Sequence, residues 1–390
     1  MAHILHTIDW LLYIVFGINI LYLLVYSVAS CRRPLPLSSK ASLRKRFAIL
    51  IPAYREDAVI HDCVHSCLEQ DYPLESYDIV VISDRMQPET NASLASMPIR
   101  LVEVNFEHST KSKALNAGMA AIGNEYDIAL VLDAYNVIPD NYLSDINDFF
   151  AQPGVEVVQT HRVAKNLNSD MAFLDAISEE INNSIFRLGH VNLGLSAALI
   201  GSGMAFRYDL FCDTMTRIKA VGGFDRELEL TLLYGGKRFH YLPDTFVFDE
   251  KIQNVDDFSR QRRRWLSAQW YYCRKFSGHM GRAIIDRNWD FCDKFFQQLS
   301  IPRLLLLGFT FLLSLLVTFF CWQWGMKWWL LLTLLFVALM LAVPRRLCTS
   351  RLAMALQKLP HTFWLMAGNL FKLRGANKNF IHTKHGMTGK

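Results

Sequence analysis

The sequence lacks the cysteine and histidine patterns that bind zinc or form a disulfide framework. Its eight cysteines are scattered singly along 390 residues, and no C-x-x-C pair occurs. Cys63 and Cys67 are one helical turn apart, a spacing that suits buried thiols better than a zinc site. His61 and His65 are four residues apart but lack the glutamate of a H-E-x-x-H site. We therefore expect reduced cysteines and a domain that faces the cytosol.

Internal repeats, low-complexity tracts and a large excess of one charge are also missing. The chain has 41 Lys and Arg against 36 Asp and Glu, a net charge of only +5. Hydrophobic residues, in contrast, make up 52% of the chain, which is high for a purely soluble protein. The length is sufficient for one soluble domain of ordinary size plus membrane segments.

Three apolar segments are long enough to cross a bilayer: residues 10–29, 304–322 and 328–343. Basic residues follow the first segment, precede the second and follow the third. The positive-inside rule therefore places residues 32–303 in the cytoplasm. A cleaved signal peptide is the alternative for the first segment, but no Lys or Arg precedes it.

The second and third apolar segments are separated by only residues 323–327, so they are expected to form a hairpin with its turn there. Tryptophans cluster at this turn, as in the aromatic belt of a membrane protein. Residues 352–373 are apolar but interrupted by Lys358 and Pro360. We expect this stretch to be a helix that lies in the membrane interface rather than a fourth span.

Between the membrane segments, short apolar runs alternate with helical patterns. Strands are predicted at residues 47–51, 78–82, 99–104 and 127–132, and helices at residues 57–68 and 113–122. Such alternation predicts an α/β fold with a mostly parallel sheet covered on both faces. Ligands bind such sheets beyond the carboxyl ends of the strands. The loops that follow the predicted strands are therefore the first place to look for a site.

Carboxylates and lysines follow several of these strands, in a pattern that suits a uridine diphosphate. Asp84 can accept a hydrogen bond from a uracil N–H, and Lys113 can contact a phosphate. Asp133 can ligate a divalent cation that bridges two phosphates. The alternative for either aspartate is that it caps the helix that follows, which is the commoner use of an aspartate after a strand.

A second group of candidate residues precedes the apolar hairpin, in the run Gln-Arg-Arg-Arg-Trp at 261–265. Arg264 can neutralise a diphosphate, Trp265 can stack on a sugar ring, and Gln261 can hold the loop. The alternative is a basic cluster next to the membrane that binds anionic lipid.

Four motifs occur in order: P-A-Y-x-E at 52–56, K-A-L-N at 113–116, G-S-G-M-A-F-R at 201–207 and Q-R-R-R-W at 261–265. Their order resembles the membrane-bound family 2 glycosyltransferases, the group with cellulose-, chitin- and hyaluronan-synthase-like enzymes and bacterial glycolipid transferases. The resemblance implies a GT-A domain, which is a Rossmann-like nucleotide-sugar-binding fold with a mostly parallel sheet, flanked here by transmembrane helices. It also implies inverting transfer of a sugar from a nucleotide diphosphate donor, with a UDP-sugar expected, to a lipid-linked or glycan acceptor.

The expected protein is thus an integral protein of a bacterial inner membrane that contacts membrane lipids and binds no nucleic acid. Its predicted parts are an N-terminal anchor at 1–31, a GT-A domain at 46–255, a Q-x-x-R-W segment with interfacial helices at 256–300, a transmembrane hairpin at 304–344, and an interfacial helix with a cytoplasmic tail at 345–390.

Two positions depart from the family pattern. The family has Asp-x-Asp after the fourth strand, whereas here Tyr135 replaces the second Asp, and a phenol is a poorer ligand for the expected Mg²⁺ or Mn²⁺. The family's catalytic base lies in a Thr/Ser-Glu-Asp triplet. Glu227 matches this base best, with Glu229 as the second choice. The expected substrate-binding residues are Pro52, Ala53, Tyr54, Glu56, Asp84, Lys113, Asn116, Asp133, Gly203, Gln261, Arg264 and Trp265.

Two other function classes compete with the enzyme. The altered Asp-x-Asp motif suits a weak or inactive homologue that binds nucleotide sugars as a sensor or scaffold. The basic cluster suits a nucleic-acid or phospholipid binder, which would show steep salt dependence. The acidic residues at the sheet edge argue against this last class, because they would repel a polyanion. Glycines such as Gly203 can also serve only close backbone packing.

Overall fold

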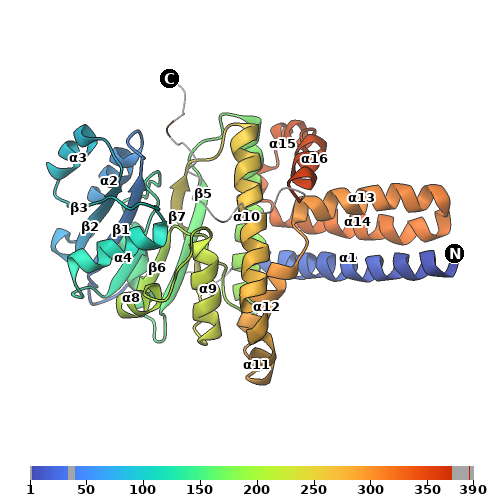
Figure 1. Cartoon of the computed structure of the whole chain (residues 1–390), viewed down its shortest axis with the longest axis horizontal. Coiled ribbons are helices and arrows are strands. Elements are labelled where there is room, and N and C mark those ends of the chain that lie inside the picture. Colours follow the sequence, from blue (N-terminus) through green and yellow to red (C-terminus); the bar gives the residue numbers. More distant parts are fainter. Residues whose placement is uncertain (1, 34–39, 371–385, 387–390) are drawn as a thin grey trace.

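The computed structural model describes residues 2–33, 40–370 and 386 of the chain. Its centre is a seven-stranded sheet with the order β3-β2-β1-β4-β6-β5-β7, in which only β6 runs antiparallel to its neighbours (Figure 1). The predicted α/β class is confirmed, and the four predicted strands correspond to β1–β4. The strands are β1 Phe47–Tyr54, β2 Tyr77–Asp84, β3 Arg100–Val104, β4 Ile128–Val131, β5 Val157–Ala164, β6 Met204–Arg207 and β7 His240–Asp249.

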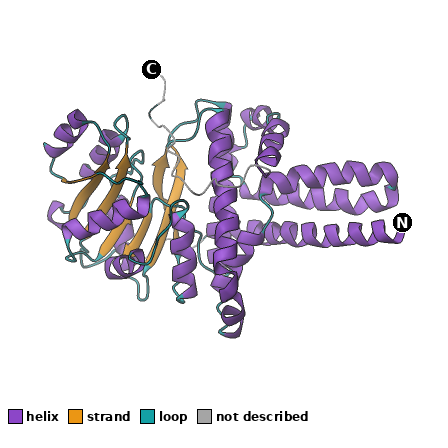
Figure 2. Cartoon of the chain, viewed as in Figure 1, coloured by secondary structure: helices purple, strands orange, loops and turns teal. Residues whose placement is uncertain are grey.

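Helices cover both faces of this sheet (Figure 2), so the central strands bury both of their sides. In β1, Ala48 and Leu50 join the core under α4, α8 and α9, whereas Phe47 and Ile49 join the core under α2 and α5. This two-sided burial explains the continuous apolar run of the first strand. The helices around the sheet are α2 Ile60–Leu68, α3 Pro88–Ala95, α4 Lys111–Ile122, α5 Tyr142–Phe150, α6 Asp170–Asn182, α7 His190–Asn192, α8 Tyr208–Met215 and α9 Phe224–Tyr234.

Three apolar helices, α1 Ala2–Ser30, α13 Arg303–Phe320 and α14 Trp322–Ala342, project together from one side of this domain (Figure 1). Each is long and apolar enough to cross a membrane. The hairpin between α13 and α14 turns at Cys321, so the prediction of a turn at residues 323–327 was wrong in position. Gly325 packs against Thr318 on the opposite helix, and this close approach lets α14 begin directly after the turn.

The C-terminal part of α1 is held against the sheet domain by side-chain and backbone contacts. The hydroxyl of Tyr22 donates to Asp293 Oδ1 at 2.8 Å, and a side chain at Gly189 would collide with the backbone of Tyr26. Near the far end of the bundle, Asp9 forms an ion pair with Lys327. Specific contacts therefore hold α1 to the sheet domain at one end and to α14 at the other.

Several further helices lie between the sheet and the apolar bundle. The longest of them, α10, runs crosswise to the bundle (Figure 1). The apolar stretch predicted as one interfacial helix is divided into two, α15 and α16, and its last residues, with the predicted tail at 371–385 and 387–390, lie outside the described residues. The helices of this layer are α10 Val255–Phe276, α11 Met280–Ile285, α12 Trp289–Leu299, α15 Ser350–Leu356 and α16 Leu359–Leu370.

Candidate active site

A cavity of about 810 Å³ opens at the carboxyl edge of the sheet and continues toward the apolar helices. At the sheet edge it is lined by loops that follow β1, β2 and β4. Toward the bundle it is lined by Leu307 of α13, by Leu339 and Met340 of α14, and by residues of α15 and α16. One continuous space therefore contacts both the expected nucleotide site and the helices expected to cross the membrane.

Most of the predicted site residues line this cavity, because parallel strands end at the same edge. Tyr54 and Asp84, for example, are register partners at the ends of β1 and β2. The Q-x-x-R-W residues reach the same space from α10. The predicted residues that line the cavity are Pro52, Ala53, Tyr54, Glu56, Asp84, Asp133, Glu229, Gln261, Arg264 and Trp265.

Four predicted residues are not among those that line the cavity: Lys113, Asn116, Gly203 and Glu227. The Lys113 ammonium donates to the His108 carbonyl at 2.9 Å, and the Asn116 amide donates to the Met215 carbonyl at 3.2 Å. Both side chains are thus engaged in holding local structure.

Gly203 serves backbone packing, which was the alternative considered for it. Its φ is +60°, and a Cβ there would lie 2.6 Å from the Thr160 hydroxyl. Gly201, two residues earlier, has φ +93° and lines the cavity instead. The G-S-G motif therefore contributes Gly201 rather than Gly203 to the wall of the site.

Asp84 has the environment of a ligand-binding carboxylate. It is 2% exposed, lines the cavity, and its Oδ1 atom has no hydrogen-bond partner among the described residues. A buried acceptor without a partner is costly, and a ligand N–H would satisfy it. The position suits an acceptor for a nucleobase N–H.

Both carboxylate oxygens of Asp133 interact with other side chains of the protein. The Lys111 ammonium forms an ion pair with Oδ1, and the Tyr135 hydroxyl donates to Oδ2 at 3.2 Å. Burial, together with the nearby Asp133 charge, raises the pKa of Tyr135, so the phenol stays protonated and acts as a donor. Lys111 thus lines the cavity beside Asp133, whereas Lys113, the lysine predicted to contact a phosphate, does not line it.

The donor set at this position does not fit a divalent metal held by an Asp-x-Asp pair. Asp133 is its one carboxylate, and Tyr135 offers a proton donor where a second carboxylate is expected. Among the described residues, no group of three His, Cys, Asp or Glu side chains is arranged to hold a metal ion. Mg²⁺ and Mn²⁺ prefer carboxylate, carbonyl and water oxygens in open coordination positions.

Three acidic residues of α9 have different surroundings, although they are spaced only two residues apart. Glu227, the predicted base, is 3% exposed and forms an ion pair with Lys275 at 2.7 Å. Tyr272 also donates to it at 3.3 Å. Glu229, the second choice, lines the cavity but forms an ion pair with Lys294 at 3.1 Å.

Asp225, the third of these acidic residues, was passed over in the sequence reasoning. It is half-buried, lines the cavity beside Gly201, and makes no hydrogen bond or ion pair with any described residue. The sequence did contain a signal for it. Gly222 and Gly223 precede the helix, and Gly223 has φ +68°, so Asp225 falls in the first helical turn.

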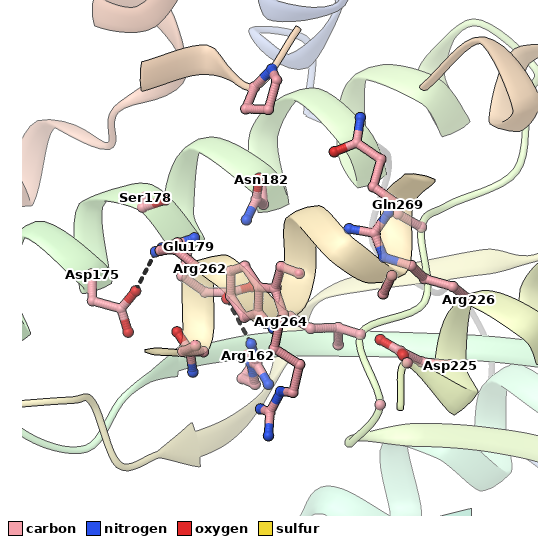
Figure 3. A pocket seen from close by; sticks show the side chains of 18 of the residues that line it. Arg162, Asp175, Ser178, Glu179, Asn182, Asp225, Arg226, Arg262, Arg264 and Gln269 are labelled. Atoms are coloured by element: carbon pink, nitrogen blue, oxygen red, sulfur yellow. Dashed lines mark hydrogen bonds and ion pairs between the residues drawn. The ribbon is translucent and has the colours of Figure 1, made fainter. Parts of the chain in front are cut away.

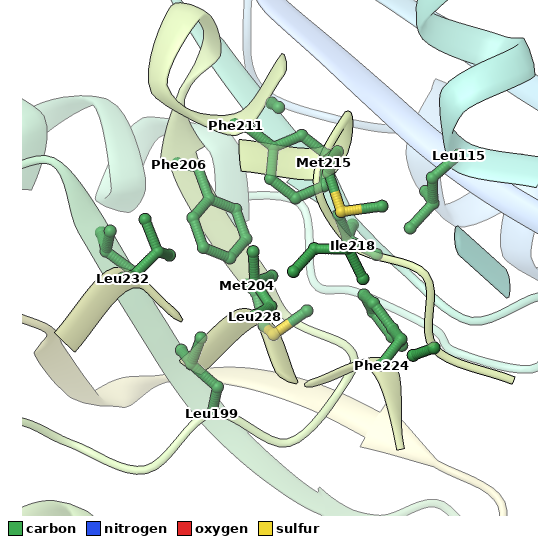
Figure 4. Close-up of a cluster of buried hydrophobic side chains, with 14 of the residues drawn as sticks. Leu115, Leu199, Met204, Phe206, Phe211, Met215, Ile218, Phe224, Leu228 and Leu232 are labelled. Carbon is green, nitrogen blue, oxygen red and sulfur yellow. The ribbon is translucent and has the colours of Figure 1, made fainter. Parts of the chain in front are cut away.

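The packing of α9 fixes these orientations. Figure 4 shows Phe224, Leu228 and Leu232 of this helix against Phe206 and Met215 in one buried apolar cluster. Because the helix is held along this face, its acidic residues cannot rotate freely between the cavity and the α10 side. The difference between Asp225 and Glu227 is therefore built into the core.

The cavity wall that includes α6 carries a network of buried charges (Figure 3). Arg162 and Arg187 both contact Glu179, at 2.8 and 3.2 Å. Burial alone would raise the pKa of Glu179, but Arg162, Lys251 and Arg187 outweigh it and hold that pKa well below the usual range. This network forms a rigid polar wall between the sheet edge and the apolar part of the cavity.

The α10 helix supplies the remaining cations. Arg262 forms an ion pair with Asp175 at 2.7 Å and stacks over Trp265, 4.3 Å from its ring centre. Arg264, on the same helix, lines the cavity as well, and Figure 3 shows it close to Arg162. Arg262 thus fixes Trp265, and its role in the motif was not predicted.

The fold and this site define a class of protein. A mostly parallel sheet with one antiparallel strand, and a polar cavity at its carboxyl edge, are the features of a GT-A nucleotide-sugar-binding domain. Residues 45–268 match the family described as "Glycosyltransferase like family 2", and the chain belongs to that family.

Relatives and solved structures agree with this family. The chain is 27% identical over 236 residues to an N-acetylglucosaminyltransferase of Rhizobium meliloti (strain 1021), covering 56% of this chain and 54% of the relative. It is 24% identical over 251 residues to the probable glycosyltransferase YdaM of Bacillus subtilis (strain 168), covering 59% and 57%. The matches thus span a little over half the length of these relatives.

A similar fold occurs in the mannosyltransferase PcManGT from Pyrobaculum calidifontis, solved in complex with GDP-Man and Mn²⁺. The TM-score is 0.55 at 15% identity, and the similarity covers 94% of this chain and 98% of that one. At this level of identity the likeness concerns the fold. It extends beyond the sheet domain to most of the chain.

Proposed function

We propose that this protein is a membrane glycosyltransferase that transfers a sugar from a nucleotide diphosphate donor, with inversion, to a lipid-linked acceptor. The observation that carries the proposal is the single cavity that contacts both Asp84 and Asp133 at the sheet edge and Leu307 and Met340 on the apolar helices. A glycan acceptor without a lipid is the alternative. We also propose that the transfer takes place at the cytoplasmic face and that the protein belongs to the processive-synthase-like subgroup.

The donor lies at the carboxyl edge of the sheet. Oδ1 of Asp84, which has no hydrogen-bond partner among the described residues, accepts from a nucleobase N–H, which uracil offers in a UDP-sugar. The diphosphate lies between Lys111 and Arg264, which approach the cavity from α4 and α10. Trp265, fixed by Arg262, presents its ring to the sugar or to the acceptor glycan.

The reaction needs a base for the acceptor hydroxyl, and Asp225 is the residue proposed for it. The hydroxyl oxygen attacks the anomeric carbon while its proton moves to the Asp225 carboxylate. The bond from the anomeric carbon to the diphosphate oxygen breaks, and the diphosphate leaves with the electron pair. Glu227 instead anchors α10 through Lys275.

The apolar part of the cavity supports a lipid chain on the acceptor. Leu307, Leu339 and Met340 line it from helices that are long and apolar enough to cross a membrane. Burying a chain there recovers roughly 25 cal/mol for each Å² of apolar surface removed from water. The acceptor's head group would then reach the polar wall formed by Glu179 and its arginines.

The direct test is release of nucleoside diphosphate from a panel of sugar nucleotides by the purified full chain in detergent, with and without a polyprenyl or diacylglycerol acceptor. The proposal predicts release that increases when a lipid acceptor is added. Binding of nucleoside diphosphate without any release or transfer would support the second candidate, a non-catalytic homologue. That candidate is favoured by Tyr135, which replaces an expected metal ligand.

A further inference from the structure

A lysine side chain of the protein occupies the position where a metal ion is expected beside the donor diphosphate. The Lys111 ammonium is bonded to Asp133 Oδ1, and both residues line the cavity. The other oxygen, Oδ2, accepts from the Tyr135 hydroxyl at 3.2 Å. A divalent cation at Asp133 would have to compete with the Lys111 ammonium for Oδ1 and with the Tyr135 hydroxyl for Oδ2.

The loop after β4 does not offer another side-chain oxygen to replace the missing aspartate as a metal ligand. The Asn136 side chain, which could have compensated for the missing aspartate, is fully buried. Its oxygen accepts from the Asp133 backbone N–H at 2.8 Å, and its nitrogen donates to Asp249 at 3.1 Å. Asn136 thus holds the loop to the end of β7 and does not face the donor.

Lys111 is held firmly in its position. It is the first residue of α4, and its ammonium also donates to the Gly201 carbonyl at 2.6 Å and lies 5.1 Å from the ring centre of Phe224. Its side chain is only 20% exposed. These contacts come from three different segments of the chain, so the ammonium is fixed before any ligand binds.

The start of α4 adds to the positive charge. Thr110 caps this helix by accepting from the Lys113 backbone N–H at 3.2 Å, and Ser109, Thr110 and Lys111 all line the cavity. The amino end of a helix of this length favours a phosphate through its unpaired N–H groups and its dipole. Helix and ammonium therefore present positive charge to the same part of the cavity.

Resting on the function proposed above, we propose that Lys111, supported by the amino end of α4, replaces the divalent cation as the partner of the donor diphosphate. Donor binding and sugar transfer then proceed without a metal ion. As the bond from the anomeric carbon to the diphosphate oxygen breaks, the leaving diphosphate takes the electron pair, and Lys111 and Arg264 stabilise its charge. Tyr135 keeps Asp133 turned toward Lys111.

The test measures binding of UDP, GDP, ADP and CDP to the full chain in detergent by calorimetry, in buffer with EDTA and in buffer with Mn²⁺. For the nucleotide that binds most tightly, the inference predicts closely similar affinities in the two buffers. It also predicts that the release of nucleoside diphosphate from the matching sugar nucleotide is not abolished by EDTA. Affinity or release that requires Mn²⁺ overturns the inference and leaves the proposed function standing.

Two matched lysine variants test whether Lys111 is the residue that allows nucleotide binding without a metal ion. Lys111→Met should weaken binding in EDTA about 10- to 100-fold, the range expected for a lost hydrogen bond from a charged donor. Lys113→Met is the control, because Lys113 does not line the cavity. Equal affinity of the two variants in EDTA contradicts the assigned role of Lys111.

A third variant tests the inference even if Lys111→Met does not fold. Tyr135→Asp restores a second carboxylate and removes the donor to Oδ2, so its nucleotide binding should become tighter in Mn²⁺ than in EDTA. An unchanged ratio for this variant contradicts the proposal that Tyr135 and Lys111 together make the site independent of metal. Failure of all four nucleotides to bind in both buffers overturns the proposed function together with this inference.

Discussion

Asp225 and Glu227 lie two residues apart on α9, yet Asp225 lines the cavity while Glu227 is bound to Lys275 of α10. The sequence pattern assigned the catalytic base to Glu227, with Glu229 as the second choice, and did not single out Asp225. Asp225 is available to a ligand, whereas Glu227 joins two helices that both line the site. Substitutions at the two positions should therefore have different consequences.

Glu227→Gln should lower stability more than activity. The change removes the charge that pairs with Lys275 while keeping an acceptor for Tyr272, so we expect a loss of about 1–2 kcal/mol in the free energy of unfolding. Sugar transfer should stay close to the wild-type rate. Thermal unfolding and transfer assays on the same preparation check this, and loss of turnover without loss of stability would contradict it.

Asp84→Asn should weaken the binding of the donor nucleotide. The carboxylate is buried with one oxygen unpartnered among the described residues, so replacing it by an amide removes a charge-assisted hydrogen bond to the nucleobase, about 10- to 100-fold in affinity. Calorimetric titration with UDP measures the change. Glu103→Gln on the exposed side of β3 is the control, and equal effects of both variants would refute the role of Asp84.

Leu307→Trp should block the apolar part of the cavity. The larger ring would fill space that the acceptor's lipid chain needs, and misplacing the acceptor by about 1 Å can cost on the order of 10²-fold in rate. Leu316→Trp on the same helix is the control, because Leu316 is 56% exposed on the outside of the bundle.

The assay for this pair compares transfer to a lipid acceptor with the slow release of nucleoside diphosphate to water. Leu307→Trp should lose the first and keep the second, and Leu316→Trp should keep both. A Leu307→Trp variant with wild-type lipid transfer would exclude this route for the acceptor.

Glu179→Gln should destabilise the protein and change its response to acid. Glu179 is buried between Arg162 and Arg187, and removing one partner of such a network typically costs about 3–5 kcal/mol. Because the arginines lower the pKa of Glu179 below its usual 4.5, its stabilising contribution is complete above that pH. The contribution is lost as the pH falls through the lower pKa of the folded state.

Thermal unfolding between pH 3 and pH 7 measures both effects. The Glu179→Gln variant should have a lower midpoint at neutral pH and a weaker decline in acid. Asp209→Asn, at the exposed ion pair with Arg207, is the control and should change stability by no more than about 0.5 kcal/mol. Parallel acid profiles for wild type and Glu179→Gln would contradict the assigned linkage.

The sequence was sufficient to predict which loops lie at the carboxyl edge of the sheet. Buried parallel strands are visible in the sequence as apolar runs, and they end at the same edge. Asp84, Asp133 and the loop at 52–56 were found in this way. Lys113 was the lysine predicted to contact a phosphate, whereas Lys111 is the one that lines the cavity. Both lysines lie in the first turn of one helix, and their directions depend on how α4 packs against β1 and β2, which no local pattern shows.

The acidic residues of α9 illustrate the same limit. Matching Glu227 to a family triplet ignored where the helix begins, and Gly223 sets that point. The charge network of Glu179 could not be predicted either, because its members come from α6, β5, the loop after β7 and a π-helical segment at Asn183–Gly189. Such contacts arise only when distant segments pack together.

The most direct measurement is the rate of nucleoside diphosphate release by Asp225→Asn in the presence of a lipid acceptor. Loss of a general base should lower the rate on the order of 10²- to 10⁴-fold, while calorimetry shows nucleotide affinity close to wild type. Glu227→Gln in the same assay should stay active. A fully active Asp225→Asn, beside an inactive and stable Glu227→Gln, would contradict the proposed site.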